Sequence, residues 1–288
     1  MRRLIEQELS AWKLKKKPMP LIIRGARQIG KSYVVEQFGK TQFDHCAVVN
    51  FELMPQLKTV FAELNPHNIV KTLELALNIP IRPQETLLFL DEIQDCPEAI
   101  MALRYFKEKM PDLHVIAAGS LLEFALQARN FRMPVGRVQF LYMKPLSFKE
   151  FLFAMKKDAL VNLIETITWE TDIPSIIHDQ LLEQMIRYCC LGGMPGVLQD
   201  YLENQSFLSA RHVQTAILAT YRNDFGKYCN VAKHKYLEAL FAKSPEIIAQ
   251  QFRYVNVARD MQARDIKEAL NNLNRAGIIH QIFSVNAT

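Results

Sequence analysis

Blocks of consecutive apolar residues alternate with helically spaced ones through the first half of the chain. A strand buried on both faces carries such a block, whereas apolar residues three and four positions apart indicate an amphipathic helix. The pattern predicts strands over residues 21–25, 45–53, 85–92, 113–120 and 136–143. It predicts helices over residues 2–12, 33–38, 57–79 and 97–110. This alternation favours an α/β fold with a mostly parallel, five-stranded sheet covered on both faces.

After the last of these strands the chain changes to helical spacing alone. Ser147 is expected to start the first helix of this part, because its hydroxyl can cap the backbone while Glu150 reaches back to the cap. A later helix is expected to end at Gly192 or Gly193, since Pro195 prevents its continuation. The pattern therefore predicts a helical domain behind the sheet.

The C-terminal part has a different pattern of apolar residues, with short helical segments followed by a strand pattern over residues 279–285. Its helical segments cover residues 235–243, 244–252 and 264–278. Helices in this order before a strand are typical of a winged helix. We therefore expect a core over residues 1–155, a helical domain over 156–229 and a winged helix over 230–288.

Composition and charge agree with a globular protein and exclude several classes. Of the 288 residues 49% are apolar, yet no apolar run approaches the roughly 18 residues that cross a bilayer, so no membrane association is expected. The five cysteines form no CxxC pair, which favours reduced thiols and a cytoplasmic location over a disulfide framework or a zinc site. The net charge of +5 permits a nucleic-acid partner without requiring one.

Residues 25–32, with the sequence GARQIGKS, fit the phosphate-binding pattern GxxxxGK followed by Ser or Thr. The glycines allow a tight loop whose backbone N–H groups point at phosphate oxygens, and the following helix adds its positive end. Lys31 is expected to reach the β- and γ-phosphates of a nucleoside triphosphate, and Ser32 to bind Mg²⁺. A glycine turn without a ligand is the alternative, which the strand before the loop and the helix after it disfavour. The predicted cofactor contacts are Gly25, Ala26, Arg27, Gln28, Ile29, Gly30, Lys31 and Ser32.

Two carboxylates follow the apolar run of residues 87–90. A buried strand of this kind delivers them at its carboxyl end, where ligands bind in open α/β sheets. Asp91 is expected to hold Mg²⁺, and Glu92 to orient and polarise a water for attack on the γ-phosphate. An acidic helix cap after a strand is the alternative. A base directly after the metal-binding carboxylate favours a hydrolase over a simple kinase.

Further residues are candidates for the γ-phosphate end of the site. Ser120 ends the fourth strand and could place its hydroxyl beside the γ-phosphate or the attacking water, or it could cap the next helix. Arg137 precedes the fifth strand and could stabilise the transition state, in the same chain or across a subunit boundary of a homo-oligomer. Arg129 and Arg132 are rivals for that role, and a surface ion pair is the alternative for each of them.

Several longer strings occur together in an order typical of one group of proteins. They are RGARQIGKS (24–32), DEIQ (91–94), AAGSLLEF (117–124), PLSFKEF (145–151) and GGMPGVL (192–198). From about residue 15 to its end, the chain resembles the AAA-like ATP-binding proteins of bacteria and archaea, which join an ATPase core to a C-terminal region of unknown function.

The resemblance implies ATP and Mg²⁺ as ligands. It also implies a P-loop core of AAA type, with the strand of the loop beside the strand that ends at Ser120, followed by helices and a winged helix. Members of the group usually continue into a further domain, so the winged helix is expected to be truncated at residue 288. Site roles carry over directly to Lys31, Ser32, Asp91 and Glu92, and by position to Ser120 and Arg137.

The predicted helix over 264–278 has two different faces, and Gly277 is expected to end it. Its apolar face is formed by Ile266, Ala269, Leu270 and Leu273. The opposite face suits phosphate and base-edge contacts in the major groove of DNA, although a solvated face or one packed on another domain is the alternative. It consists of Arg264, Lys267, Asn271, Asn272, Asn274 and Arg275.

Three functions are compatible with these features. The leading one is a Mg²⁺-dependent ATPase in which binding and hydrolysis rearrange the helical and winged-helix domains. The second is a conformational latch for DNA or a protein, which holds ATP with little turnover. The third is a small-molecule kinase, which the long helical part and the winged helix disfavour.

Overall fold

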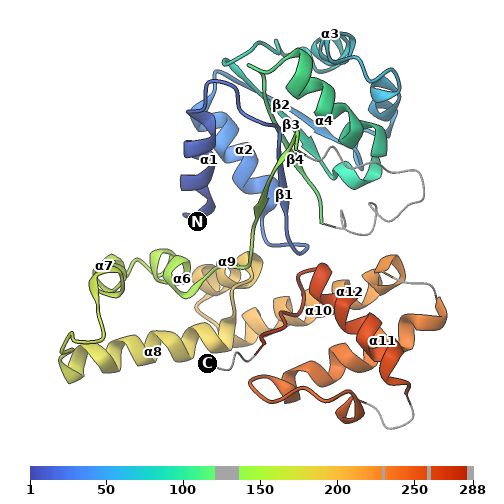
Figure 1. Ribbon diagram of the computed structural model, residues 1–288. Coiled ribbons are helices and arrows are strands. Elements are labelled where there is room, and N and C mark those ends of the chain that lie inside the picture. Colours follow the sequence, from blue (N-terminus) through green and yellow to red (C-terminus); the bar gives the residue numbers. More distant parts are fainter. Residues whose placement is uncertain (121–135, 229–230, 258–260, 284–288) are drawn as a thin grey trace, which may run out of the picture.

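The computed structural model describes residues 1–120, 136–228, 231–257 and 261–283, and its first part is an α/β domain (Figure 1). The strands of its sheet are β1 (Leu21–Arg24), β2 (His45–Asn50), β3 (Thr86–Asp91), β4 (His114–Ala118) and β5 (Gln139–Tyr142). They pair in the order β2-β3-β4-β1-β5, and each of these pairs is parallel. The predicted α/β fold is confirmed, with β1 beside β4.

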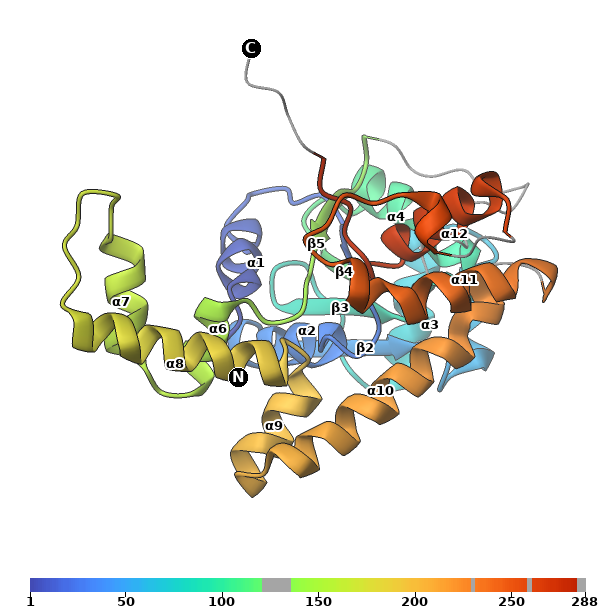
Figure 2. The same cartoon turned by 90° about the horizontal axis from the view of Figure 1, so that it is seen from below.

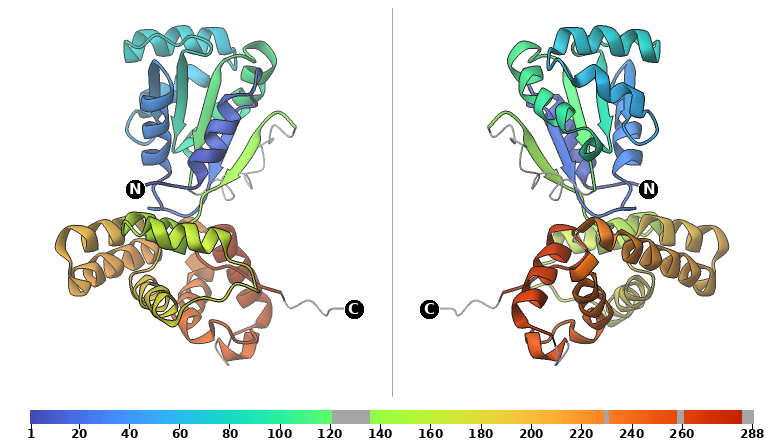
Figure 3. Two further views of the ribbon diagram at one scale, coloured as in Figure 1. Left: turned by 90° about the vertical axis from the view of Figure 1, so that its left-hand side faces the viewer. Right: turned by 90° about the vertical axis from the view of Figure 1, so that its right-hand side faces the viewer.

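Helices cover both faces of this sheet (Figure 3). They are α1 (Ile5–Lys13), α2 (Lys31–Gln42), α3 (Pro66–Leu77) and α4 (Pro97–Lys109), with 3-10 turns at Pro55–Phe61 and Ile93–Asp95. Successive side chains along each strand point to opposite faces of the sheet, as the pleat requires. Leu21 and Ile23 of β1 pack in the core formed with α1 and α2, whereas Ile22 packs in the core formed with α3 and α4. The apolar blocks of the sequence therefore reflect burial on both sides.

A helical region follows the sheet and lies beside the carboxyl ends of its strands (Figure 1; Figure 2 gives the view from the side of this region). Its helices are α6 (Phe148–Ala154), α7 (Asp158–Thr166), α8 (Ser175–Leu191), α9 (Pro195–Asn204), α10 (Phe207–Tyr228), α11 (Val231–Lys243) and α12 (Ala263–Arg275). Both predicted helix ends are confirmed. Ser147 and Glu150 form a reciprocal cap at the start of α6, and α8 is followed by Gly192 with φ 74°.

The C-terminal helices share a small core of their own. Phe225 near the end of α10 packs with Leu237 and Leu240 of α11 and with Leu273 of α12. The apolar face predicted for α12 is confirmed, because Ile266, Ala269, Leu270 and Leu273 are all buried. Among the described residues, no helix is both long enough and apolar enough to span a bilayer.

Two expectations for this part of the chain are wrong. Residues 244–252 form only a 3-10 turn at Ser244–Ile247, because Ala249 adopts φ 61°, which no right-handed helix contains. Residues 279–283 form no strand, and residues 284–285 of the predicted strand lie outside the described residues. A strand needs a hydrogen-bonded neighbour, and none is present in the C-terminal part that the structure describes. The wing of the expected winged helix is therefore absent from residues 279–283.

Candidate nucleotide-binding site

The predicted phosphate loop, residues 25–32, connects β1 to α2 at the carboxyl edge of the sheet. Gly25 enters the loop with φ 146°, and a Cβ atom there would lie 2.1 Å from the Met143 carbonyl oxygen. Gly30 has φ 87° and forms the N-cap of α2. Both glycines are therefore required by the backbone, and the loop leads into the positive end of a helix, where an anion is stabilised.

Lys31 is buried at the start of α2, and its ammonium group is directed back into the loop. Its Nζ donates hydrogen bonds to the carbonyl oxygens of Gly25 and Ala26, at 3.0 and 2.7 Å. Burial lowers the pKa of Lys31 to about 8, although the nearby Glu92 and Asp91 carboxylates favour its charged form. The lysine thus lies within the loop that would hold the phosphates, with two carbonyls as its present partners.

Asp91 ends β3 and lies beside Ser32, the residue after the lysine. Hydrogen bonds from Ser32 and from Asn50, whose Nδ2 is 3.0 Å from Asp91 Oδ2, favour the charged carboxylate. Burial has the larger effect and raises the Asp91 pKa above its usual value. A hydroxyl and a carboxylate in contact are the hard oxygen ligands that Mg²⁺ prefers, so these residues fit the ion.

Glu92 follows Asp91 in a left-handed conformation, with φ 48°, before the turn at Ile93–Asp95. Its carboxylate Oε2 accepts a hydrogen bond of 2.6 Å from the side-chain amide of Gln94. The same amide group lies against the end of β4, because a Cβ atom on Gly119 would be 2.4 Å from Gln94 Oε1. Gln94 therefore holds the carboxylate of Glu92 at the carboxyl edge between β3 and β4.

Ser120, the predicted sensor, is buried at the end of β4 and contacts the phosphate loop. Its hydroxyl accepts a hydrogen bond from Nε of Arg27 at 3.3 Å. The Arg27 guanidinium also pairs with Asp224 of α10 at 2.9 Å. The alternative role of Ser120, as the cap of the next helix, concerns residues that lie outside the described ones.

Arg137 is not brought to this site within one chain. It lies before β5, at the amino end of a parallel strand, whereas the loop and Asp91 lie at carboxyl ends. There its Nε is 3.2 Å from the Glu108 carboxylate, in a half-exposed ion pair. A role within the same chain is therefore wrong on geometric grounds, and a role in a neighbouring copy stays a prediction. Arg129 and Arg132 lie outside the described residues.

Residues far away in the sequence also contact the loop, and no local pattern marks them. Arg3 binds the carbonyl of Ile29, and Tyr221 of α10 binds that of Arg27. A cavity of about 260 Å³ opens beside the loop. Side chains of both halves of the chain line it, among them Arg24, Ser120, Lys144, Asn274 and Arg275.

This cavity changes the interpretation of the polar face of α12. Asn272 is buried, and Asn274 and Arg275 face the cavity beside the loop. Gly277, just after the helix, is so close to the loop that a Cβ atom there would lie 3.4 Å from the Ala26 nitrogen. The end of α12 therefore packs on the α/β domain, which agrees with the alternative that this face packs on another domain.

Sequence comparisons match two families to different parts of the chain. Residues 17–152 match the family described as an AAA domain, and residues 182–288 match a domain of unknown function (DUF8612). A comparison with curated proteins finds no significant match.

One solved structure has a similar fold at low sequence identity, and a second is similar over most of the chain with a lower TM-score. A Walker-type ATPase of Pyrococcus abyssi is similar over 96% of this chain and 89% of that chain, with 16% identity and a TM-score of 0.57. The ORC2 protein of Aeropyrum pernix, solved as ADPNP–ADP complexes, is similar over 96% of this chain and 86% of that chain, with 12% identity and a TM-score of 0.46.

Proposed function

We propose that this chain, whose residues 17–152 form an AAA domain, binds ATP with Mg²⁺ in the loop of residues 25–32 and hydrolyses it. We further propose that binding and hydrolysis change how the helical region lies on that domain. AAA domains are P-loop modules that bind ATP, so the nucleotide follows from the family. Turnover, the metal ion and the coupling are proposed from the contacts of this chain.

One observation carries the proposal of hydrolysis: a buried lysine, an oxygen ligand pair and a carboxylate that can act as a base meet at one edge of the sheet. Lys31 is close enough to Asp91 and Glu92 for both charges to favour its ammonium form. Asp91 contacts Ser32, and Glu92 is the next residue along the chain. The charges of a triphosphate and of its metal ion thus have complementary partners in a site that excludes much of the water.

Each residue has a proposed task. When bound, Mg²⁺ would neutralise phosphate charge between Ser32 and Asp91. Lys31 would leave the carbonyls of Gly25 and Ala26 and bind phosphate oxygens. Glu92 would accept a hydrogen bond from the attacking water and orient it, and Ser120 would approach the γ-phosphate.

Contacts between the loop and α10 support the proposed coupling. Arg27 is bound to Asp224 through its side chain and to Tyr221 through its carbonyl, and it also contacts Ser120. A triphosphate that attracts the Arg27 guanidinium would compete with Asp224. ATP binding would therefore weaken one attachment of the helical region, and loss of the γ-phosphate would restore it.

Steady-state ATP hydrolysis tests this function. Glu92→Gln is expected to lower kcat by about a hundredfold or more and to leave ATP binding intact, because the base is lost and the loop is unchanged. Lys31→Ala is expected to weaken binding itself. Glu85→Gln is a matched control, since Glu85 is half-exposed and precedes the same strand at its opposite end. Unchanged turnover in Glu92→Gln would exclude Glu92 as the base.

The alternatives make different predictions in the same assay. A latch would bind ATP and show little turnover with or without duplex DNA, whereas DNA as a partner of the ATPase would change its rate. A kinase would transfer phosphate to an added acceptor. A trans-acting Arg137 would require a homo-oligomer, so Arg137→Ala would lower turnover only if the chain self-associates with ATP.

A further inference from the structure

Two side chains from outside the phosphate loop bind its backbone on either side of Gln28. Arg3 Nη1 donates to the Ile29 carbonyl at 2.8 Å, and the Tyr221 hydroxyl donates to the Arg27 carbonyl at 2.8 Å. Gln28 between them has φ 62°, a left-handed conformation that a residue other than glycine adopts only at a cost. The least favourable backbone position of the loop is therefore held from both sides.

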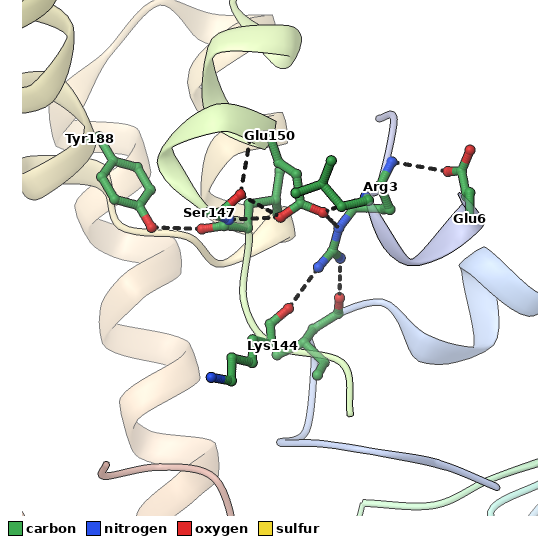
Figure 4. A network of polar contacts seen from close by, with 9 residues as sticks. Arg3, Glu6, Lys144, Ser147, Glu150 and Tyr188 are labelled. Carbon is green, nitrogen blue, oxygen red and sulfur yellow. Dashed lines mark hydrogen bonds and ion pairs between the residues drawn. The ribbon is translucent and has the colours of Figure 1, made fainter. Parts of the chain in front are cut away.

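Arg3 is itself fixed by the start of the helical region (Figure 4). Its Nε donates to the Glu150 carboxylate at 2.9 Å, and its Nη2 donates to the Lys144 carbonyl at 2.6 Å. Glu150 in turn caps α6 with Ser147 and accepts the backbone N–H of Leu4. Both side chains of the ion pair are more than nine-tenths buried, so the guanidinium has little freedom to leave the loop.

Tyr221 approaches the loop from α10 and is buried as well. Burial, together with the charge of Asp224, raises the pKa of Tyr221 to about 12, so its hydroxyl keeps its proton and remains a donor. Asp224 lies one turn further along α10 and holds the side chain of the same residue, Arg27, whose carbonyl Tyr221 binds.

The orientation of a carbonyl fixes the next N–H group. A trans peptide is planar, and its C=O and N–H bonds point in opposite directions. Binding of the Ile29 carbonyl from outside therefore turns the Gly30 N–H towards the other side, and binding of the Arg27 carbonyl does the same for Gln28. Phosphate loops bind anions through N–H groups that converge in this way.

We propose that Arg3 and Tyr221 are positioning residues of the phosphate loop, which hold the N–H groups of Gly30 and Gln28 ready for the phosphates of ATP. This inference rests on the proposed ATP binding and extends it to two residues that do not touch the nucleotide. One of them belongs to α10, so the affinity of the loop depends on the docking of the helical region.

The proposal predicts a particular kinetic result. Without the hydrogen bond from Arg3 or Tyr221, the nucleotide-free loop spends part of its time with a flipped peptide. The apparent affinity for MgATP then falls in proportion to the fraction of loops that can still bind phosphate. Saturating ATP restores the competent loop, so KM rises while kcat stays near its original value. A residue that merely stabilised the fold would change neither constant at a temperature where the protein is folded.

The test measures MgATP affinity by calorimetry and KM and kcat by steady-state hydrolysis in single variants. Tyr221→Phe removes one hydroxyl and is expected to weaken binding by about three- to tenfold, the worth of one hydrogen bond. Arg3→Lys keeps a positive charge beside Glu150 but cannot span three acceptors, and it is expected to weaken binding by about tenfold or more. Melting of the nucleotide-free variants shows that they are folded.

Tyr188→Phe is the matched control, because the Tyr188 hydroxyl also donates to a backbone carbonyl, that of Leu146, at 2.7 Å and away from the loop. It is expected to bind MgATP as the unmodified protein does. Wild-type affinity in both Tyr221→Phe and Arg3→Lys would overturn the inference, as would a fall of kcat without a rise of KM. An unmodified protein that does not bind MgATP would instead refute the proposed function.

Discussion

Asp224 of α10 forms an ion pair with Arg27 of the phosphate loop, in which Nη1 is 2.9 Å from each carboxylate oxygen. The two residues are 197 positions apart in the sequence. Their side chains are mostly buried, so the pair is poorly screened by water. It attaches the helical region directly to the loop that is proposed to bind ATP.

Removal of this carboxylate is expected to destabilise the protein. Asp224→Ala leaves Arg27 without that partner in a mostly buried place, and we expect the free energy of unfolding to fall by about 2 kcal/mol. Urea denaturation measures the change. Glu268→Ala is the control, because its pair with Lys233 is well exposed and should contribute less than about 0.5 kcal/mol. Equal losses in the two variants would contradict a special role for the Arg27 pair.

The pH dependence of ATP binding follows from the buried lysine. In the empty protein Lys31 has a pKa of about 8, lowered by burial, and phosphate oxygens would raise it. The lysine therefore carries its proton below about pH 8, and above that pH binding must take up a proton. We expect the affinity for MgATP to fall by up to about tenfold per pH unit above pH 8, and calorimetry in buffers of different ionisation enthalpy to detect proton uptake.

Lys31→Arg separates this effect from other titrations. A guanidinium stays charged throughout the range, so the variant should bind more weakly but without the dependence on pH above about 8. An unchanged pH dependence in Lys31→Arg would show that another group takes up the proton.

Substitution by alanine is expected to have opposite effects at two glycines, one with a backbone conformation that requires glycine and one within a helix. Gly25→Ala would place a Cβ atom 2.1 Å from the Met143 carbonyl oxygen at a φ of 146°, so we expect a loss of several kcal/mol in stability and loss of ATP binding. Gly226 lies within α10, and no atom is within 4 Å of a Cβ atom built there. Gly226→Ala is expected to stabilise the protein by about 1 kcal/mol. Thermal melting measures the stability of both variants. A stable Gly25→Ala protein that binds ATP would contradict this account of the loop.

The sequence predicted those features that depend on neighbouring residues. The loop, the strand that ends at Asp91 and the cap formed by Ser147 and Glu150 each arise from a few consecutive positions, and the structure has all three. Gly192 likewise ends α8 as expected, because its positive φ of 74° favours glycine.

Features that depend on distant contacts were missed. Nothing near Arg3, Tyr221 or Asp224 marks them as partners of the loop, because the packing of α1 and α10 brings them there. The same limit explains why a strand was wrongly expected over residues 279–283, since an apolar pattern cannot show whether a pairing strand exists. Arg137 was misplaced within the chain, although its place before a parallel strand already puts it at the amino edge of the sheet, opposite the loop and Asp91.

The most direct test of the central claim is a crystal structure of the Glu92→Gln protein with MgATP. The account predicts the triphosphate within the loop of residues 25–32, the metal ion between Ser32 and Asp91, and the Lys31 ammonium moved from the carbonyls of Gly25 and Ala26 to phosphate oxygens. ATP bound elsewhere, with Lys31 still hydrogen-bonded to those two carbonyls, would contradict it.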